Sequence, residues 1–111
     1  MDLDQISACI KVAASICARD GLISQAEEEM MFKLVSEKIP NYQLDQFNHV
    51  IDEFFDSTEQ IEDYLSKISN PEVRKFTLQL SEVSASVDGL DIRENIALQK
   101  AHLVWAGASH E

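Results

Sequence analysis

The chain has little of what breaks or staples a fold, with two prolines, three glycines and two cysteines among 111 residues. It also lacks any stretch approaching the ~20 apolar residues that span a bilayer, so we expect no membrane insertion. The N-terminus carries Asp2 and Asp4 where a signal peptide carries Lys or Arg. A chain of this length can bury one core without metal or disulfide staples. We therefore expect a single helical domain over residues 1–111 of a cytoplasmic protein.

The two cysteines are too far apart to bridge each other. Cys9 and Cys17 lie eight positions apart on one expected helix, which separates them by ~12 Å along its axis. A disulfide needs Cα atoms within ~7 Å. We expect free, buried thiols.

Positive charge is also scarce, because nine Lys and Arg face twenty Asp and Glu and leave a formal net charge of −11. Such a chain repels nucleic-acid phosphates, so we expect no direct nucleic-acid binding. Between Lys38 and Lys67 there is no basic residue. One interpretation of this gap is a solvated face that keeps the protein soluble. The other is a binding surface for a protein partner with a basic surface, centred on Asp52, Glu53, Asp56 and Glu59.

Apolar residues recur with helical period along the whole chain, and no alternating strand pattern interrupts them. The prediction is an all-α bundle of about six helices. The first, about residues 4 to 18, is apolar nearly all round and is placed at the centre. The second runs from Ser24 to the residues before Pro40, and the third covers residues 42 to 55.

Cap signals mark where the other helices begin. Ser57 with Gln60 predicts a capping box for the fourth helix, and Asn70 followed by Pro71 begins the fifth. Asp91 and Glu94 form the expected capping pair of the sixth. Predicted core residues of the last two helices are Val73, Phe76, Leu80, Val83 and Val87, then Ile92, Ile96, Ala101, Val104 and Trp105. The aromatic residues Phe47, Phe54, Phe55 and Tyr64 are also expected in the core.

One local pattern occurs twice, as a long apolar helix, an Asp-Gly corner, and a new helix with a glutamate in its first turn. The two segments are Cys17-Ala-Arg-Asp-Gly-Leu-Ile-Ser-Gln-Ala-Glu27 and Ala85-Ser-Val-Asp-Gly-Leu-Asp-Ile-Arg-Glu94. Glycine takes the positive φ that ends a helix, and an Asp before it hydrogen-bonds amides of the turn.

This doubled corner resembles the TerB-like family, named for tellurite resistance protein B and including the N-terminal domain of a membrane-attached DnaJ-type co-chaperone. The resemblance covers about residues 6 to 105. It implies a helical bundle in which the two corners approach each other and bind divalent cations, with a role in stress or phage-related responses through partner proteins. The family's paired acids match Asp20, Glu27, Asp88 and Glu94, and its small residue three before the Asp matches Ala85, with Cys17 in the first half.

The chain departs from the family pattern in two places. Arg19 stands where a small residue is usual, and the second corner is one residue shorter. Neither corner is an EF-hand on its own, because Ile16 and Ala18 occupy the opening ligand positions of the first and have no side-chain oxygen.

Two interpretations of the corner acids stay open. They supply hard oxygen ligands that hold Ca²⁺ or Mg²⁺ jointly, or they only cap their helices.

Catalytic signatures are missing from the sequence. His49, His102 and His110 are scattered, and there is no glycine-rich phosphate loop. We expect a non-enzymatic module. The first hypothesis is a TerB-like stress-response or defence-associated module that acts through protein partners. The alternative is a small acidic inhibitor of the kind mobile elements encode, which covers a basic or nucleic-acid-binding surface of its target.

Overall fold

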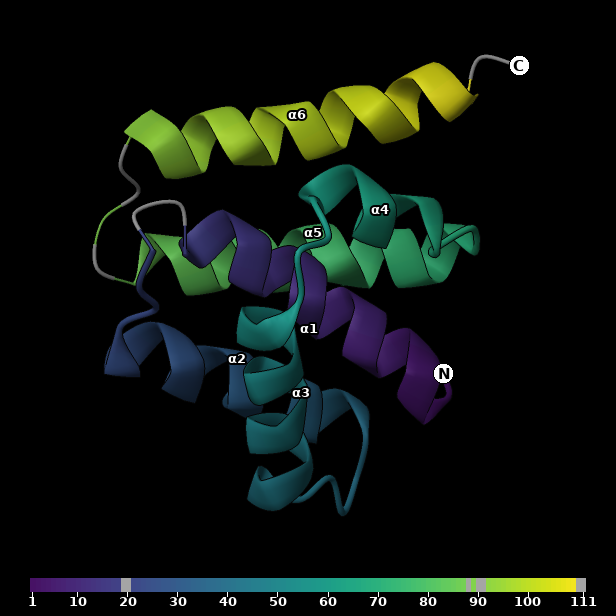
Figure 1. The fold of residues 1–111 in the computed structure, drawn as a ribbon. Helices are drawn as coiled ribbons and strands as arrows, with labels where there is room; N and C mark the ends of the chain where they lie inside the picture. The colour runs from purple at the N-terminus through teal and green to yellow at the C-terminus, as the bar shows by residue number, and fades with distance from the viewer. Residues whose placement is uncertain (19–20, 88, 90–91, 110–111) are drawn as a thin grey trace.

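The computed structural model describes residues 1–18, 21–87, 89 and 92–109. This part of the chain consists of six helices and contains no strand, which confirms the all-α prediction (Figure 1). The helices are α1 (Leu3–Cys17), α2 (Gln25–Lys38), α3 (Leu44–Asp56), α4 (Ile61–Ser66), α5 (Pro71–Ser86) and α6 (Ile92–Ser109). Among these helices, none combines the length and the apolar content needed to cross a membrane.

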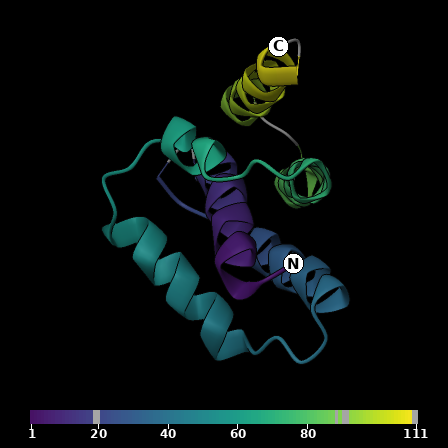
Figure 2. The same cartoon turned by 90° about the vertical axis from the view of Figure 1, so that its right-hand side faces the viewer.

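Helix α1 is the centre of the fold. It contacts each of the other five helices, which are arranged around it (Figure 2). Every residue from Val12 to Cys17 is buried. The predicted central position of this helix is therefore confirmed. It follows from the sequence, which places apolar residues on nearly every side of the helix.

The cap signals place most helix starts correctly. Ser24 caps α2 in a capping box with Glu27, and Asn70 caps α5 with Pro71 at its first position. The prediction for α4 was wrong, because its N-cap is Gln60, whose backbone N–H donates to Asp63 Oδ2 at 2.8 Å. Ser57 instead ends α3. Two overlapping boxes compete here, and the later one has a carboxylate, the better acceptor, at its third position.

The predicted core residues of α5 are confirmed at Val73 and Leu80, which are buried, and Phe76 is half-buried, but the last two positions were wrong. Val83 and Val87 are exposed, whereas Thr77, Ser81 and Ser84 are buried. Two of these hydroxyls donate to carbonyls one turn earlier in α5. Because the hydrogen bonds stay inside the helix, the outer face of these short side chains is effectively apolar and allows close approach to α1.

Two further core predictions were wrong in part, since Ala101 and Trp105 of the α6 set and Phe47 and Tyr64 of the aromatic set are buried as predicted. In α6, Ile92, Ile96 and Val104 are exposed, while Ala97, Leu98, Ala101 and Trp105 are buried. Trp105 anchors the helix, because its Nε1–H donates to the carbonyl of Leu65 in α4. Of the four aromatic residues, Phe47 and Tyr64 are buried and Phe54 is half-buried, but Phe55 is exposed.

The assignment of inner and outer faces predicts unequal effects of the same substitution. Ile10 in α1 is fully buried, whereas Ile96 in α6 is 62% exposed. Ile10→Ala removes buried methylenes and leaves a cavity, so it should lower the free energy of unfolding by about 3 kcal/mol. Ile96→Ala should change it by less than about 0.5 kcal/mol. Urea denaturation followed by circular dichroism measures both, and equal losses would contradict the placement of α6.

Candidate cation site between the helix corners

The glycines of the two corners have similar backbone conformations and hydrogen bonds. Gly21 and Gly89 both take positive φ, at 93° and 87°. Each glycine N–H donates to the carbonyl three residues earlier, Ala18 for Gly21 and Ser86 for Gly89. Positive φ is the conformation in which glycine has no Cβ penalty. The predicted role of both glycines is therefore confirmed.

The glutamates after the corners also occupy equivalent places. Glu27 is the third residue of α2, and Glu94 is the third residue of α6. The second corner is one residue shorter, but α6 begins correspondingly earlier after Gly89. The difference in corner length therefore does not move Glu94 away from the first turn of its helix.

The structure brings three ligand-type side chains together at this end of the bundle. Helices α1 and α5 both run toward it, and α2 and α6 begin there (Figure 1). Cys17, Glu27 and Glu94 are buried, and one potential ligand atom from each lies within 4.8 Å of the others. The three residues come from α1, α2 and α6, so the cluster depends on the tertiary fold.

Two of the four predicted corner acids lie in the described residues. Glu27 and Glu94 lie together, whereas Asp20 and Asp88 fall outside the described residues, as does Asp91. From the sequence alone, Cys17 is expected to be an ordinary buried thiol. The available signal was its place three residues before Asp20, equivalent to Ala85 before Asp88, which puts it at the corner end of its helix.

Capping alone does not explain why these glutamates are buried. Glu27 does cap α2, because Ser24 N–H donates to its Oε1 at 2.9 Å. Gln46 and Asp63 fill the same third position in the boxes of α3 and α4, and both are exposed. Glu27 and Glu94, by contrast, are only 5% and 7% exposed. A capping carboxylate can stay in water, so the burial needs a further cause.

The residues predicted to bind a protein partner lie at the surface on and after α3. Asp52, Glu53, Asp56 and Glu59 are all exposed. Glu53 lies 3.7 Å from Lys11 Nζ, and Glu59 pairs with Lys67 at 2.8 Å. The ion pair with Glu59 is the main reason that the pKa of Lys67 is raised. These four residues are therefore not equivalent, because two of them already interact with lysines.

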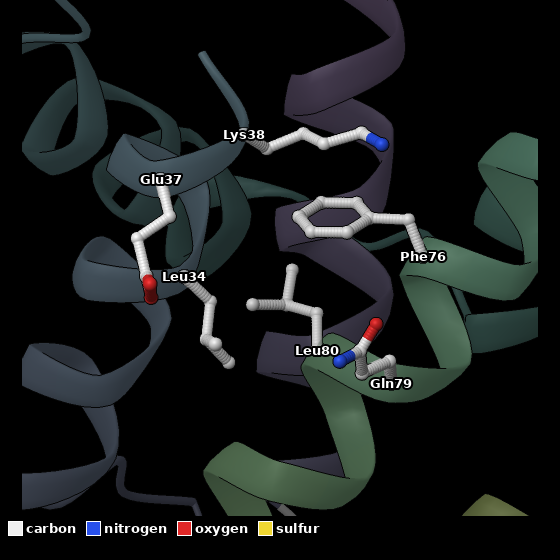
Figure 3. Close-up of a pocket in the computed structure, with 6 residues that line it drawn as sticks. All are labelled: Leu34, Glu37, Lys38, Phe76, Gln79 and Leu80. Atoms are coloured by element: carbon white, nitrogen blue, oxygen red, sulfur yellow. The ribbon is translucent and has the colours of Figure 1, made fainter. Parts of the chain in front are cut away.

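A separate groove lies between α2 and α5, away from the predicted residues. Leu34, Glu37 and Lys38 line one side and Phe76, Gln79 and Leu80 line the other, around a volume of 230 Å³ (Figure 3). Lys38 Nζ lies 5.7 Å from the centre of the Phe76 ring, a cation–π contact. The lining mixes one acid with one base, so it does not select a ligand charge.

Comparison of the chain with models of protein families, with curated proteins and with solved structures finds no match. The resemblance to the TerB-like family therefore stays a prediction that depends on the doubled corner.

The two cysteines differ in what surrounds them. Cys9 lies on the α5 side of α1, where Thr77 Oγ1 is 3.0 Å from its Sγ. Burial raises the pKa of Cys9 from 9.0 to about 11, and the Thr77 hydrogen bond lowers the pKa by less than burial raises it. Cys9 is therefore an inert core thiol, whereas Cys17 lies beside two carboxylates.

The raised pKa of Cys9 predicts slow alkylation of the native protein. A rise from 9.0 to about 11 leaves about 100-fold less thiolate at pH 8. Iodoacetamide should therefore modify Cys9 at least 100-fold more slowly in the native protein than in denaturant, and native reactivity should rise only as the pH approaches 11. Mass spectrometry of the peptide that contains Cys9 measures the rates. A native rate within tenfold of the denatured rate would contradict the assignment.

Proposed function

We propose that the protein is a non-enzymatic binding module in which the two repeated corners jointly hold a divalent cation. One observation supports the proposal above the others: among the acids in the described residues, Glu27 and Glu94 are the two that are buried. They are also the pair that the internal repeat relates. Two buried carboxylates at short range repel each other, and a cation between them removes that repulsion.

The donor set bears on which cation is bound. Carboxylate oxygens, including those expected from Asp20 and Asp88, suit Ca²⁺ or Mg²⁺. The sulfur of Cys17 adds a soft donor to Glu27 and Glu94, and a thiolate with carboxylates suits Zn²⁺. The proposal therefore includes all three ions. A contribution of the Cys17 sulfur to binding would favour Zn²⁺ over Ca²⁺ and Mg²⁺.

The positions of the histidines support a binding role over catalysis. His49 and His102 are both exposed, on α3 and α6, and His49 faces Glu53 of its own helix at 3.8 Å. His110 falls outside the described residues. On the basis of the doubled corner, we propose a TerB-like stress-response or defence-associated role in which the module acts through a protein partner.

Calorimetric titration tests the cation proposal. Zn²⁺, Ca²⁺ and Mg²⁺ are titrated into the unmodified protein and into the double variant Glu27→Gln with Glu94→Gln. Glutamine keeps the capping box, so the variant removes charge without removing the cap. At a free cation concentration of 100 times Kd, the unmodified protein should gain about 2.7 kcal/mol in its free energy of unfolding, and the variant should gain none.

Three further variants complete the test. Glu29→Gln with Glu53→Gln removes two exposed charges and should leave binding unchanged. Cys17→Ser should weaken Zn²⁺ more than Ca²⁺ if the sulfur is a ligand. Asp20→Asn with Asp88→Asn shows whether these acids complete the site. Absence of heat and of thermal stabilisation with all three ions would refute the proposal.

A second function rests on the acidic stretch between Lys38 and Lys67. Its acids are exposed, and Asp52 and Asp56 lie one turn apart on α3. We keep as the alternative a small acidic inhibitor that covers a basic surface of its target. Reversal of Asp52, Glu53 and Asp56 to lysine should then abolish salt-sensitive inhibition, while the corner variants remain active.

A further inference from the structure

An apolar groove with an acidic rim opens between the first turns of α2 and α3. Its volume is 290 Å³, and it is lined by Gln25, Glu28, Glu29, Phe32, Leu44, Phe47 and Asn48. None of these residues belongs to the cluster of Cys17, Glu27 and Glu94. Small-molecule sites usually measure ~300–1,000 Å³, so a groove of this size suits one large side chain better than a cofactor.

The floor of the groove is aromatic and fixed. The rings of Phe32 and Phe47 meet edge to face with their centroids 5.7 Å apart. Phe47 is buried in the core, which holds the pair in place. Leu44, the first residue of α3, lies at the edge of the groove and is 52% exposed. An apolar side chain bound here would cover Leu44 and continue the core outward.

The rim of the groove is acidic. Gln25 Nε2 donates to Glu29 Oε1 at 3.0 Å, which positions the Glu29 carboxylate over the first turn of α2. The pKa of Glu28 is raised, first by burial and then by the negative charge of Asp52 on α3. Acids from two helices therefore crowd one edge of an apolar groove. A cation at this edge would meet Glu28 and Glu29 and would also be attracted by the charge of Asp52.

We propose that this groove binds a segment of a partner protein in which one large apolar side chain is flanked by Lys or Arg. The apolar side chain fills the space above Phe32 and Phe47, and the flanking cations meet Glu28, Glu29 and Asp52. Charge complementarity identifies the occupant, because the edge combines apolar depth with an acidic rim. The inference names the partner of the proposed binding module, but it uses none of the residues of the cation site.

The test uses fluorescein-labelled peptides and fluorescence anisotropy in the presence of EDTA. The probe has one leucine between two pairs of arginines in a Gly/Ser background. One counterpart replaces the leucine by glycine, and another replaces the arginines by glutamates. We expect the probe to bind. Its affinity should fall about tenfold when the leucine is replaced, and binding should be lost when the arginines are replaced by glutamates.

Variants of the protein locate the binding. Leu44→Glu places an acid at the first position of α3, where it favours the helix dipole and preserves folding. This variant and the double variant Glu28→Gln with Glu29→Gln should each lower the affinity for the probe about tenfold. Glu72→Gln with Glu82→Gln removes the same charge from α5 and should change affinity less than twofold.

Three outcomes would overturn the inference: no binding of the probe, equal binding of the probe and its glycine counterpart, or equal effects of the α2 and α5 variants. Self-association that shifts the amide resonances of the groove would also overturn it, since a second copy would then be the occupant. The variant Glu27→Gln with Glu94→Gln should bind the probe normally. The cation proposal and this inference can therefore fail separately.

Discussion

The burial of α1 from Val12 to Cys17 is the constraint on which the rest of the structure depends. Because α1 contacts the other five helices, each neighbour must bring a surface that packs closely against it. Helix α5 does this with Thr77 and Ser81, whose hydroxyls bond within their own helix. These short side chains are buried in α5 together with the larger Val73 and Leu80.

The same constraint places the candidate cation site. Because α1 is enclosed up to Cys17, the chain leaves the core at a buried point. The first turns of α2 and α6 return to that point and bring Glu27 and Glu94 with them. Burial of these two acids is thus a consequence of where the central helix ends, and the proposed cation would offset its energetic cost.

Local signals in the sequence predicted local structure well. Caps at Ser24 and Asn70 and the positive φ of the two corner glycines follow from residues within one turn. The choice of buried face failed where it depended on a neighbour in space. Ile96 has the apolar character of a core residue, yet α6 turns Ala97 and Leu98 inward instead. Likewise, Cys17 joins Glu27 only through tertiary packing, which no spacing in the chain encodes.

Burial also separates the acids of the two proposed binding surfaces. At Glu27 and Glu94 the exposure is too low for contact with a side chain of another protein, so a compact ion is the ligand that we propose there. At Glu28, Glu29 and Asp52 the carboxylates border an open groove with an aromatic floor, so an extended basic segment can approach. Glu27 and Glu28 are neighbours in sequence on opposite sides of this division. A single turn of α2 therefore contributes to both proposed surfaces. The orientation of this turn about the helix axis determines that Glu27 faces the core and Glu28 faces outward. The cap at Ser24 sets where the turn begins.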